Sequence, residues 1–169
     1  MKPSIYDYYQ KLINERQIDL ILLGKKNSEF DRLFSLFVNL DSNFLFPRNQ
    51  EVKLETYIRK LIDKAFNFIL SDQTGDIGIA SFYANDLTNK TAFVNALGIN
   101  SENQRKNIAS LVSEFIIEFS RERGMEFMRC EVDRNNHKSI SLIQKFNFTV
   151  ERETDHNTFI MKRDIRIKE

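Results

Sequence analysis

The sequence holds few of the residues that mark metal-bound or disulfide-bonded proteins. It has one cysteine, Cys130, in 169 residues, which excludes an internal disulfide and a cysteine-rich zinc site. With only two histidines, we also expect no metal centre. Its two prolines, Pro3 and Pro47, form no proline-rich linker, and the chain has no repeat or low-complexity tract. We therefore expect a single domain over residues 1–169, long enough to bury a core.

An excess of one charge and long apolar runs are also missing. Lysine and arginine together number 25, against 24 for aspartate and glutamate, so charge gives no argument for a nucleic-acid partner. No stretch approaches the roughly 18 apolar residues that indicate a membrane-spanning helix. The first residues, Met1–Asp7, lack the apolar run of a signal peptide. We expect a cytoplasmic protein with neither a nucleic-acid nor a membrane partner.

Hydrophobic periodicity predicts alternating helices and strands along the chain. The expected helices are Tyr6–Glu15, one capped by Ser28, Leu54–Ala65, Asn107–Arg123 and His137–Phe146. The expected strands are Ile18–Leu23, Phe66–Leu70, Ile77–Ala84, Thr91–Ile99, Met125–Val132, Phe148–Arg152 and Thr158–Lys162. After the N-terminal helix the order is β-α-α-β-β-β-α-β-α-β-β. This order predicts an α/β fold (an α+β mixed sheet) with helices on both faces.

The stretch Leu97–Ala109 predicts a binding site for a phosphorylated cofactor. An apolar strand end leads through a polar turn into an amphipathic helix, and the unpaired N–H groups of a helix N-terminus attract phosphate. Arg105 and Lys106 add positive charge there. Ser101–Gln104 also fits a capping box, which would start the helix near Glu102 and remove the loop. The loop is favoured because the apolar stripe begins only at Ile108.

The element order and two motifs resemble the GNAT family of N-acetyltransferases, which use acetyl-CoA. The family's pyrophosphate loop reads Arg or Gln, two residues, Gly, one residue, then Gly or Ala. Gln104–Ala109 matches it at the first and last positions. The family's later pattern, Leu-Glu-Val to Leu-Tyr-Glu-Lys-x-Gly-Phe, aligns without a gap with Cys130–Phe148. The likeness covers residues 66–163 and adds to the prediction of a GNAT-like fold.

The resemblance implies acetyl-CoA as co-substrate and no metal. It places backbone N–H groups of Leu97, Gly98 and Ile99 at the acetyl carbonyl, which they would polarise. Asn136 corresponds to the asparagine that hydrogen-bonds the pantetheine arm, although it also fits a helix N-cap. The cofactor-binding residues implied in this way are Leu97, Gly98, Ile99, Gln104, Arg105, Lys106, Asn107, Ile108, Ala109, Ser110, Asn136, Ser139 and Lys145.

The chain departs from the family pattern at three positions. Asn107 stands where the family has its most characteristic glycine, and asparagine tolerates positive φ better than most residues. Asn147 replaces a glycine at an expected helix C-cap, where asparagine is acceptable. Ile143 stands where the family often has the tyrosine that protonates the leaving thiolate, which isoleucine cannot do. Water or Ser141 could replace that tyrosine.

The resemblance implies direct transfer of an acetyl group to a primary amine. Glu131 occupies the position of the base in relatives that act on ribosomal protein N-termini, and is the candidate catalytic residue. Its alternative is a surface or ion-paired glutamate beside Arg129 or Arg134. Cys130 alternates to the opposite strand face and is expected to be a core thiol.

The identity of the acceptor is left open, as a small-molecule or peptide amine. The resemblance implies that Phe44, Phe46 and Tyr57 could line its pocket and that His156 borders it. A second hypothesis is a catalytically degenerate module that binds acyl-CoA for sensing or protein interaction. A third is an unrelated phosphate-binding protein, although hairpin-length connections between the strands of residues 66–99 disfavour a doubly wound nucleotide fold. The sequence is compatible with a monomer or a homodimer.

Overall fold

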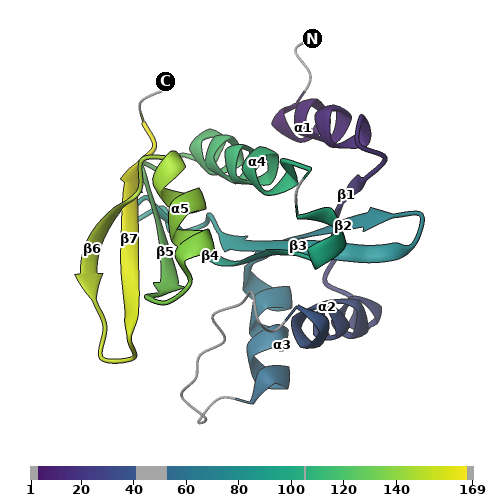
Figure 1. Cartoon of the computed structure of the whole chain (residues 1–169), viewed down its shortest axis with the longest axis horizontal. Coiled ribbons are helices and arrows are strands. Elements are labelled where there is room, and N and C mark those ends of the chain that lie inside the picture. The colour runs from purple at the N-terminus through teal and green to yellow at the C-terminus, as the bar shows by residue number, and fades with distance from the viewer. Residues whose placement is uncertain (1–3, 41–52, 105, 167–169) are drawn as a thin grey trace.

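The computed structural model describes residues 4–40, 53–104 and 106–166 (Figure 1). Its elements follow the expected order, with boundaries close to those expected from the sequence. They are α1 (Ile5–Asn14), β1 (Asp19–Leu22), α2 (Asn27–Asn39), α3 (Leu54–Lys64), β2 (Phe66–Asp72), β3 (Gly75–Tyr83), β4 (Thr91–Ile99), a short 3-10 turn (Ser101–Asn103), α4 (Ile108–Glu122), β5 (Phe127–Asp133), α5 (His137–Lys145), β6 (Thr149–Glu153) and β7 (Thr158–Asp164).

The strands form one mixed sheet of seven, in the order β1-β2-β3-β4-β5-β7-β6. Every neighbouring pair is antiparallel except β4 and β5, which run parallel and are connected through α4. This arrangement confirms the predicted mixed α/β fold. β7 lies between β5 and β6, so the last hairpin returns to pair with the strand that precedes α5.

Helices cover both faces of the sheet (Figure 1). On one face, α1 and α4 pack against β2 and β3 in a cluster that includes Ile13, Phe68, Phe82 and Phe115. Side chains of α5 join the edge of this cluster. On the other face, α2 and α3 bury a second cluster against Ile69 and Ile79. Helices therefore cover both faces of the central strands, and a ligand can reach the interior of the sheet only where two strands separate.

Such an interruption lies between β4 and β5. The two strands pair only from Thr91–Val94 with Phe127–Cys130. Past that point the register of β4 against β3 shifts, because Ser81 pairs with Ala96 and Phe82 with Val94. The intervening residue, Asn95, is left out of the register and forms a β-bulge, which bends and twists its strand. The ends of β4 and β5 thus separate, and we call the gap between them the split.

One helix boundary differs from the prediction. α2 begins at Asn27, its N-cap is Lys26, and no side chain caps it, so the expected Ser28 cap is wrong. Helix caps are a weak signal wherever tertiary packing holds the helix in place. α2 buries Leu33 and Phe37 in the second cluster, and this packing fixes its position without the cap.

Gly78 provides a test of the packing of the central strands. It lies on β3, and a Cβ atom there would stand 2.7 Å from the carbonyl oxygen of Gly98 on β4. Because a backbone atom cannot move aside cheaply, we expect Gly78→Ala to lower the free energy of unfolding by about 1–3 kcal/mol in urea denaturation. Gly24→Ala is the control, since a Cβ there meets nothing within 4 Å. Equal stability of the two variants would contradict the close approach of β3 and β4.

Candidate active site

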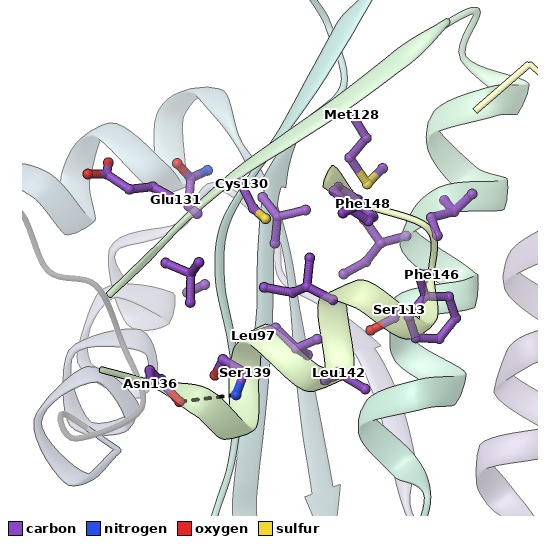
Figure 2. A pocket seen from close by; sticks show the side chains of 17 residues that line it. Leu97, Ser113, Met128, Cys130, Glu131, Asn136, Ser139, Leu142, Phe146 and Phe148 are labelled. Carbon is purple, nitrogen blue, oxygen red and sulfur yellow. Dashed lines mark hydrogen bonds between the residues drawn. The ribbon is translucent and has the colours of Figure 1, made fainter. Parts of the chain in front are cut away.

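A cavity of about 110 Å³ occupies the split (Figure 2). Its walls come from β4, β5, α4 and α5, and most of them are apolar, with Leu97, Met128, Leu142 and Phe148 among them. A narrow apolar slot of this kind suits an extended, largely apolar chain better than a charged group. The polar side chains that line it are Asn95, Ser113, Glu131, Asn136 and Ser139.

Asn136 and Ser139 stand at the first turn of α5, which closes one side of the cavity. The side-chain oxygen of Asn136 accepts a hydrogen bond from the Ser139 N–H at 3.1 Å, drawn as a dashed line in Figure 2. This confirms the interpretation of Asn136 as an N-cap. The bond also fixes the amide against the cavity, so that its NH₂ group can still donate to a ligand.

Glu131 lies on β5 with its side chain on the opposite side of the strand from Cys130 (Figure 2). It lines the cavity and also a second hollow of about 330 Å³, which Thr154, Asp155 and His156 of the β6–β7 turn border. The carboxylate is therefore placed between the cavity in the split and a surface opening. A base in that position can reach a group that enters from either side.

A chain of hydroxyl groups holds the Glu131 carboxylate. The buried Thr158 on β7 donates its Oγ1 proton to Glu131 Oε1. Thr154 Oγ1 lies 2.5 Å from Thr158 Oγ1, and because that proton is already used, Thr154 must be the donor to Thr158. The His156 N–H donates in turn to Thr154 Oγ1 at 3.2 Å. Such a chain polarises itself in one direction and orients the carboxylate.

Neither neighbouring arginine pairs with Glu131. Arg129 makes two hydrogen bonds of 2.7 Å to Glu151, and Arg134 lies 3.2 Å from Glu153, both on β6. The expected alternative, a glutamate paired to one of these arginines, is therefore wrong. Glu131 instead has the Thr158 hydroxyl as its partner, and it forms no ion pair with a described residue.

Two tyrosines lie on the same side of the sheet as Glu131. Burial raises the pKa of Tyr57 on α3, and the charges of Tyr83 and Glu131 raise it further. Burial also raises the pKa of Tyr83 at the end of β3. Both phenols thus stay protonated at neutral pH. The other expected pocket residues, Phe44 and Phe46, lie outside the described part of the chain.

The loop after β4 is tied to its surroundings by side-chain amides. The Asn100 oxygen accepts from the Asn103 side-chain amide at 2.8 Å and so holds the 3-10 turn. Gln104 donates from Nε2 to the Ile99 carbonyl at 2.9 Å, and its own oxygen accepts from Lys138 Nζ on α5. Gln104 therefore bridges the end of β4 and the start of α5. The sequence pattern gave no signal for Lys138.

The loop ends at Asn107, which has φ 56° and ψ 20°, and α4 begins at Ile108. This is the left-handed conformation that asparagine tolerates, so the turn survives without glycine, as expected. The capping-box alternative, a helix from Glu102, is wrong. No described side chain caps α4, so among the described residues the first amides of the helix, from Ile108 on, have no side-chain partner.

Of the basic residues expected at this loop, Lys106 donates from Nζ to the Asn103 side-chain oxygen at 2.8 Å. Its carbonyl accepts from Arg16 at 3.2 Å, which brings a further cation to the loop from the end of α1. Arg105 lies outside the described residues. Lys145 is exposed in the last turn of α5, at the other end of the helix from Lys138.

Ile143, which aligns with the tyrosine that often serves as the acid in the family, lines the cavity. Ser141, a suggested substitute for that tyrosine, is exposed and does not line the cavity, so that suggestion is wrong. The serines that line it are Ser113 and Ser139. The Ser113 hydroxyl already donates to the Ala109 carbonyl at 2.8 Å.

Within the described part of the chain, no group of three or more His, Cys, Asp or Glu side chains is arranged to hold a metal ion. None of its helices combines the length and apolar character that crossing a membrane requires.

Comparisons with known proteins point to one family. Residues 33–148 match the model of the acetyltransferase (GNAT) family. The structure resembles the ribosomal-protein-S18-alanine N-acetyltransferase of Escherichia coli, with 14% identity, a TM-score of 0.66, and coverage of 90% of this chain and 96% of the other. No curated protein sequence matches the chain.

Two further solved structures have the same fold. An N-acetyltransferase from Staphylococcus aureus Mu50 is 17% identical with a TM-score of 0.67, and the match covers 88% of this chain and 99% of the other. The GNAT domain of S. lividans PAT is 16% identical with a TM-score of 0.70, over 87% and 90% of the two chains. At these identities the likeness establishes the fold alone.

The Cys130 thiol provides a test of how closed the cavity wall is. The side chain is buried, and burial raises its pKa to about 12, which confirms the expected core thiol. At pH 8 the fraction of such a group that is ionised to thiolate is on the order of 1,000-fold smaller than for an ordinary cysteine. We expect iodoacetamide to alkylate the native protein slower than the urea-unfolded protein by a comparable factor, measured by mass spectrometry. Equal rates would show that the thiol is exposed and reactive.

Proposed function

Because the chain belongs to the acetyltransferase (GNAT) family, we propose that it transfers an acetyl group from acetyl-CoA to a primary amine by direct attack. The observation that carries this proposal is the position of Glu131, which lines both the cavity in the split and the hollow at the β6–β7 turn. A base at that border can serve an amine that enters from the hollow and meets an acyl group in the split.

The residues around the split fit acetyl-CoA in two respects. The uncapped N-terminus of α4 with Lys106 and Lys138 nearby suits the pyrophosphate, through N–H groups and positive charge. The apolar cavity, with Asn136 and Ser139 at its edge, suits the pantetheine arm. Leu97, Gly98, Ile99, Gln104, Asn107, Ile108, Ala109, Ser110 and the exposed Lys145 complete the proposed set, with Arg105.

The separation of β4 from β5 supplies the means to activate the acetyl carbonyl. Alternate N–H groups of a strand point to each neighbour, and beyond Val94 the neighbour on the β5 side is no longer paired. The N–H groups of the Leu97–Ile99 segment that face the split are thus available to a carbonyl oxygen. They would stabilise the negative charge that develops there during attack.

Glu131 accepts the amine proton, directly or through a water molecule, because only a neutral amine is a nucleophile. The nitrogen–carbon bond forms first, as the carbonyl oxygen takes up the π electron pair. When the carbonyl re-forms, the carbon–sulfur bond breaks and the thiolate leaves with its electron pair. The Thr158 hydroxyl holds one carboxylate oxygen and leaves the other for the proton. Because Ile143 supplies no acid, the thiolate leaves as the anion and takes its proton from solvent.

Acetyl-CoA binding is tested by thermal melting. A ligand at about 100 times its dissociation constant adds about 2.7 kcal/mol, which for this chain length raises the midpoint by about 5–10 °C. We expect that shift with acetyl-CoA and none with ATP or NAD. Asn107→Gly should keep or increase the affinity, because glycine adopts the left-handed conformation of residue 107 without strain. Loss of acetyl-CoA binding in that variant would contradict the proposed role of the loop.

The role of Glu131 is tested by Glu131→Gln, assayed by thiol release against a panel of amines. We expect kcat/KM to fall by about 10²–10⁴, the usual contribution of a general base, with unchanged affinity for acetyl-CoA. Glu151→Gln is the matched control, since it removes only the surface pairs with Arg129 and Lys162 and should leave turnover within about twofold.

An unchanged rate in Glu131→Gln would remove this residue from the mechanism. A protein that binds acetyl-CoA but acetylates none of the amines would instead support the second hypothesis, a degenerate acyl-CoA-binding module. The observation that favours that hypothesis is the presence of Ile143 in the cavity wall, where an acid would stand.

A further inference from the structure

Asn95 carries a buried hydrogen-bond donor that no described residue of the protein uses. Its Nδ2 atom has no acceptor among the described residues, although the side chain lines the cavity in the split. An unpaired buried donor is unfavourable, and native proteins keep few of them. An apolar side chain of similar size would avoid this cost, so the amide calls for an explanation in terms of a ligand.

The side chain of Asn95 lies on the face of the sheet that α2 and α3 cover. Side chains alternate along a strand, and Val94 packs with the α1–α4 cluster, so Asn95 points to the other face. The next residue, Ala96, belongs to the α2–α3 cluster, as the bulge at Asn95 requires. The donor therefore projects out of the plane of the sheet, whereas the backbone N–H groups of β4 lie within that plane.

Glu131 lies on this same face. Its neighbours Cys130 and Val132 belong to the α1–α4 cluster, so Glu131 alternates to the α2–α3 side. Asn95 and Glu131 line one cavity from the two strands that separate there. A carboxylate that takes a proton and an amide that gives a hydrogen bond thus face a common space on the side opposite α4 and α5.

This placement assigns the donor to the acceptor amine and not to the acetyl group. The acetyl oxygen would accept hydrogen bonds from backbone N–H groups of β4, which lie in the plane of the sheet. An oxygen on the α2–α3 side belongs to a molecule that enters from the hollow beside Glu131 and His156. The amine of that molecule faces the carboxylate, and its oxygen faces Asn95.

We propose that Asn95 determines acceptor specificity by donating a hydrogen bond to an oxygen carried close to the acetylated amine. The acceptor is then an oxygen-bearing amine, with a carbonyl as in an aminoacyl group or a hydroxyl as in an amino alcohol. This inference rests on the proposed acetyl transfer. An amine with only a hydrocarbon chain leaves the donor unpaired and is a poor acceptor.

The kinetic test compares glycinamide and ethanolamine with n-propylamine, an acceptor of similar size without oxygen. For the wild type and for Asn95→Leu, kcat/KM is measured for each amine, and the ratio of oxygenated to hydrocarbon acceptor is compared between the two proteins. We expect this ratio to fall by about 10–100-fold in Asn95→Leu, because the variant loses the hydrogen bond to the oxygenated amine and also the unpaired donor that disfavours n-propylamine in the wild type. A fall in the glycinamide ratio indicates that Asn95 donates to a carbonyl, and a fall in the ethanolamine ratio indicates that it donates to a hydroxyl.

Asn85→Leu is the control for the loss of an asparagine, since Asn85 is exposed and donates to the Lys64 carbonyl. We expect it to leave both ratios unchanged. A loss in Asn95→Leu that is equal for all three amines would overturn the inference, because it would place the donor on the acetyl group. An unchanged kcat/KM for all three amines would overturn it as well.

A binding measurement keeps this test independent of turnover. In ¹⁵N-labelled protein saturated with CoA, the Asn95 NH₂ signal is identified by its absence in Asn95→Leu. We expect this signal to shift on addition of glycinamide or ethanolamine and not of n-propylamine. A shift without turnover of any amine would refute the proposed function while supporting the contact. No shift with either oxygenated amine would refute the contact, whatever the activity.

Discussion

The geometry of the candidate site depends on the short pairing between the parallel strands β4 and β5. β4 and β5 share only the register from Thr91–Val94 to Phe127–Cys130, after which β4 bends at Asn95 and β5 continues along β7. A fully paired sheet would have no room between these strands. The split creates the cavity, exposes main-chain donors of β4 and sets Glu131 at an opening. The cavity and the position of Glu131 at its border both follow from the loss of that pairing.

The order of the elements could be predicted from the sequence because each carries its own periodic pattern. The turn at Asn107 was also predictable, since the apolar stripe of the following helix starts at Ile108 and asparagine accepts a left-handed backbone. Local patterns contain no information on which strand lies beside which. The contact of Thr158 with Glu131 requires β7 to insert between β5 and β6, and that placement is set by the tertiary fold.

The bulge at Asn95 was invisible for the same reason. A bulge is a mismatch between two strands, and neither strand alone shows it. Lys138 is similar, because its reach to Gln104 depends on how α5 crosses the end of β4. The family resemblance supplied what periodicity could not, namely a proposed chemical role for the loop and for Glu131. It gave no indication of Asn95, Thr158 or Lys138, because their contacts depend on how the strands and helices pack.

The two ends of the sheet have a consequence for how the protein behaves at high concentration. β1 at one end is only four residues long, and every residue of β6 at the other end is exposed, with Glu151, Arg152 and Glu153 in succession. Short edge strands and charged edge strands are poor templates for pairing with another chain. Long, flat and apolar edge strands are the ones that recruit strands of other chains. These margins instead discourage self-association into aggregates.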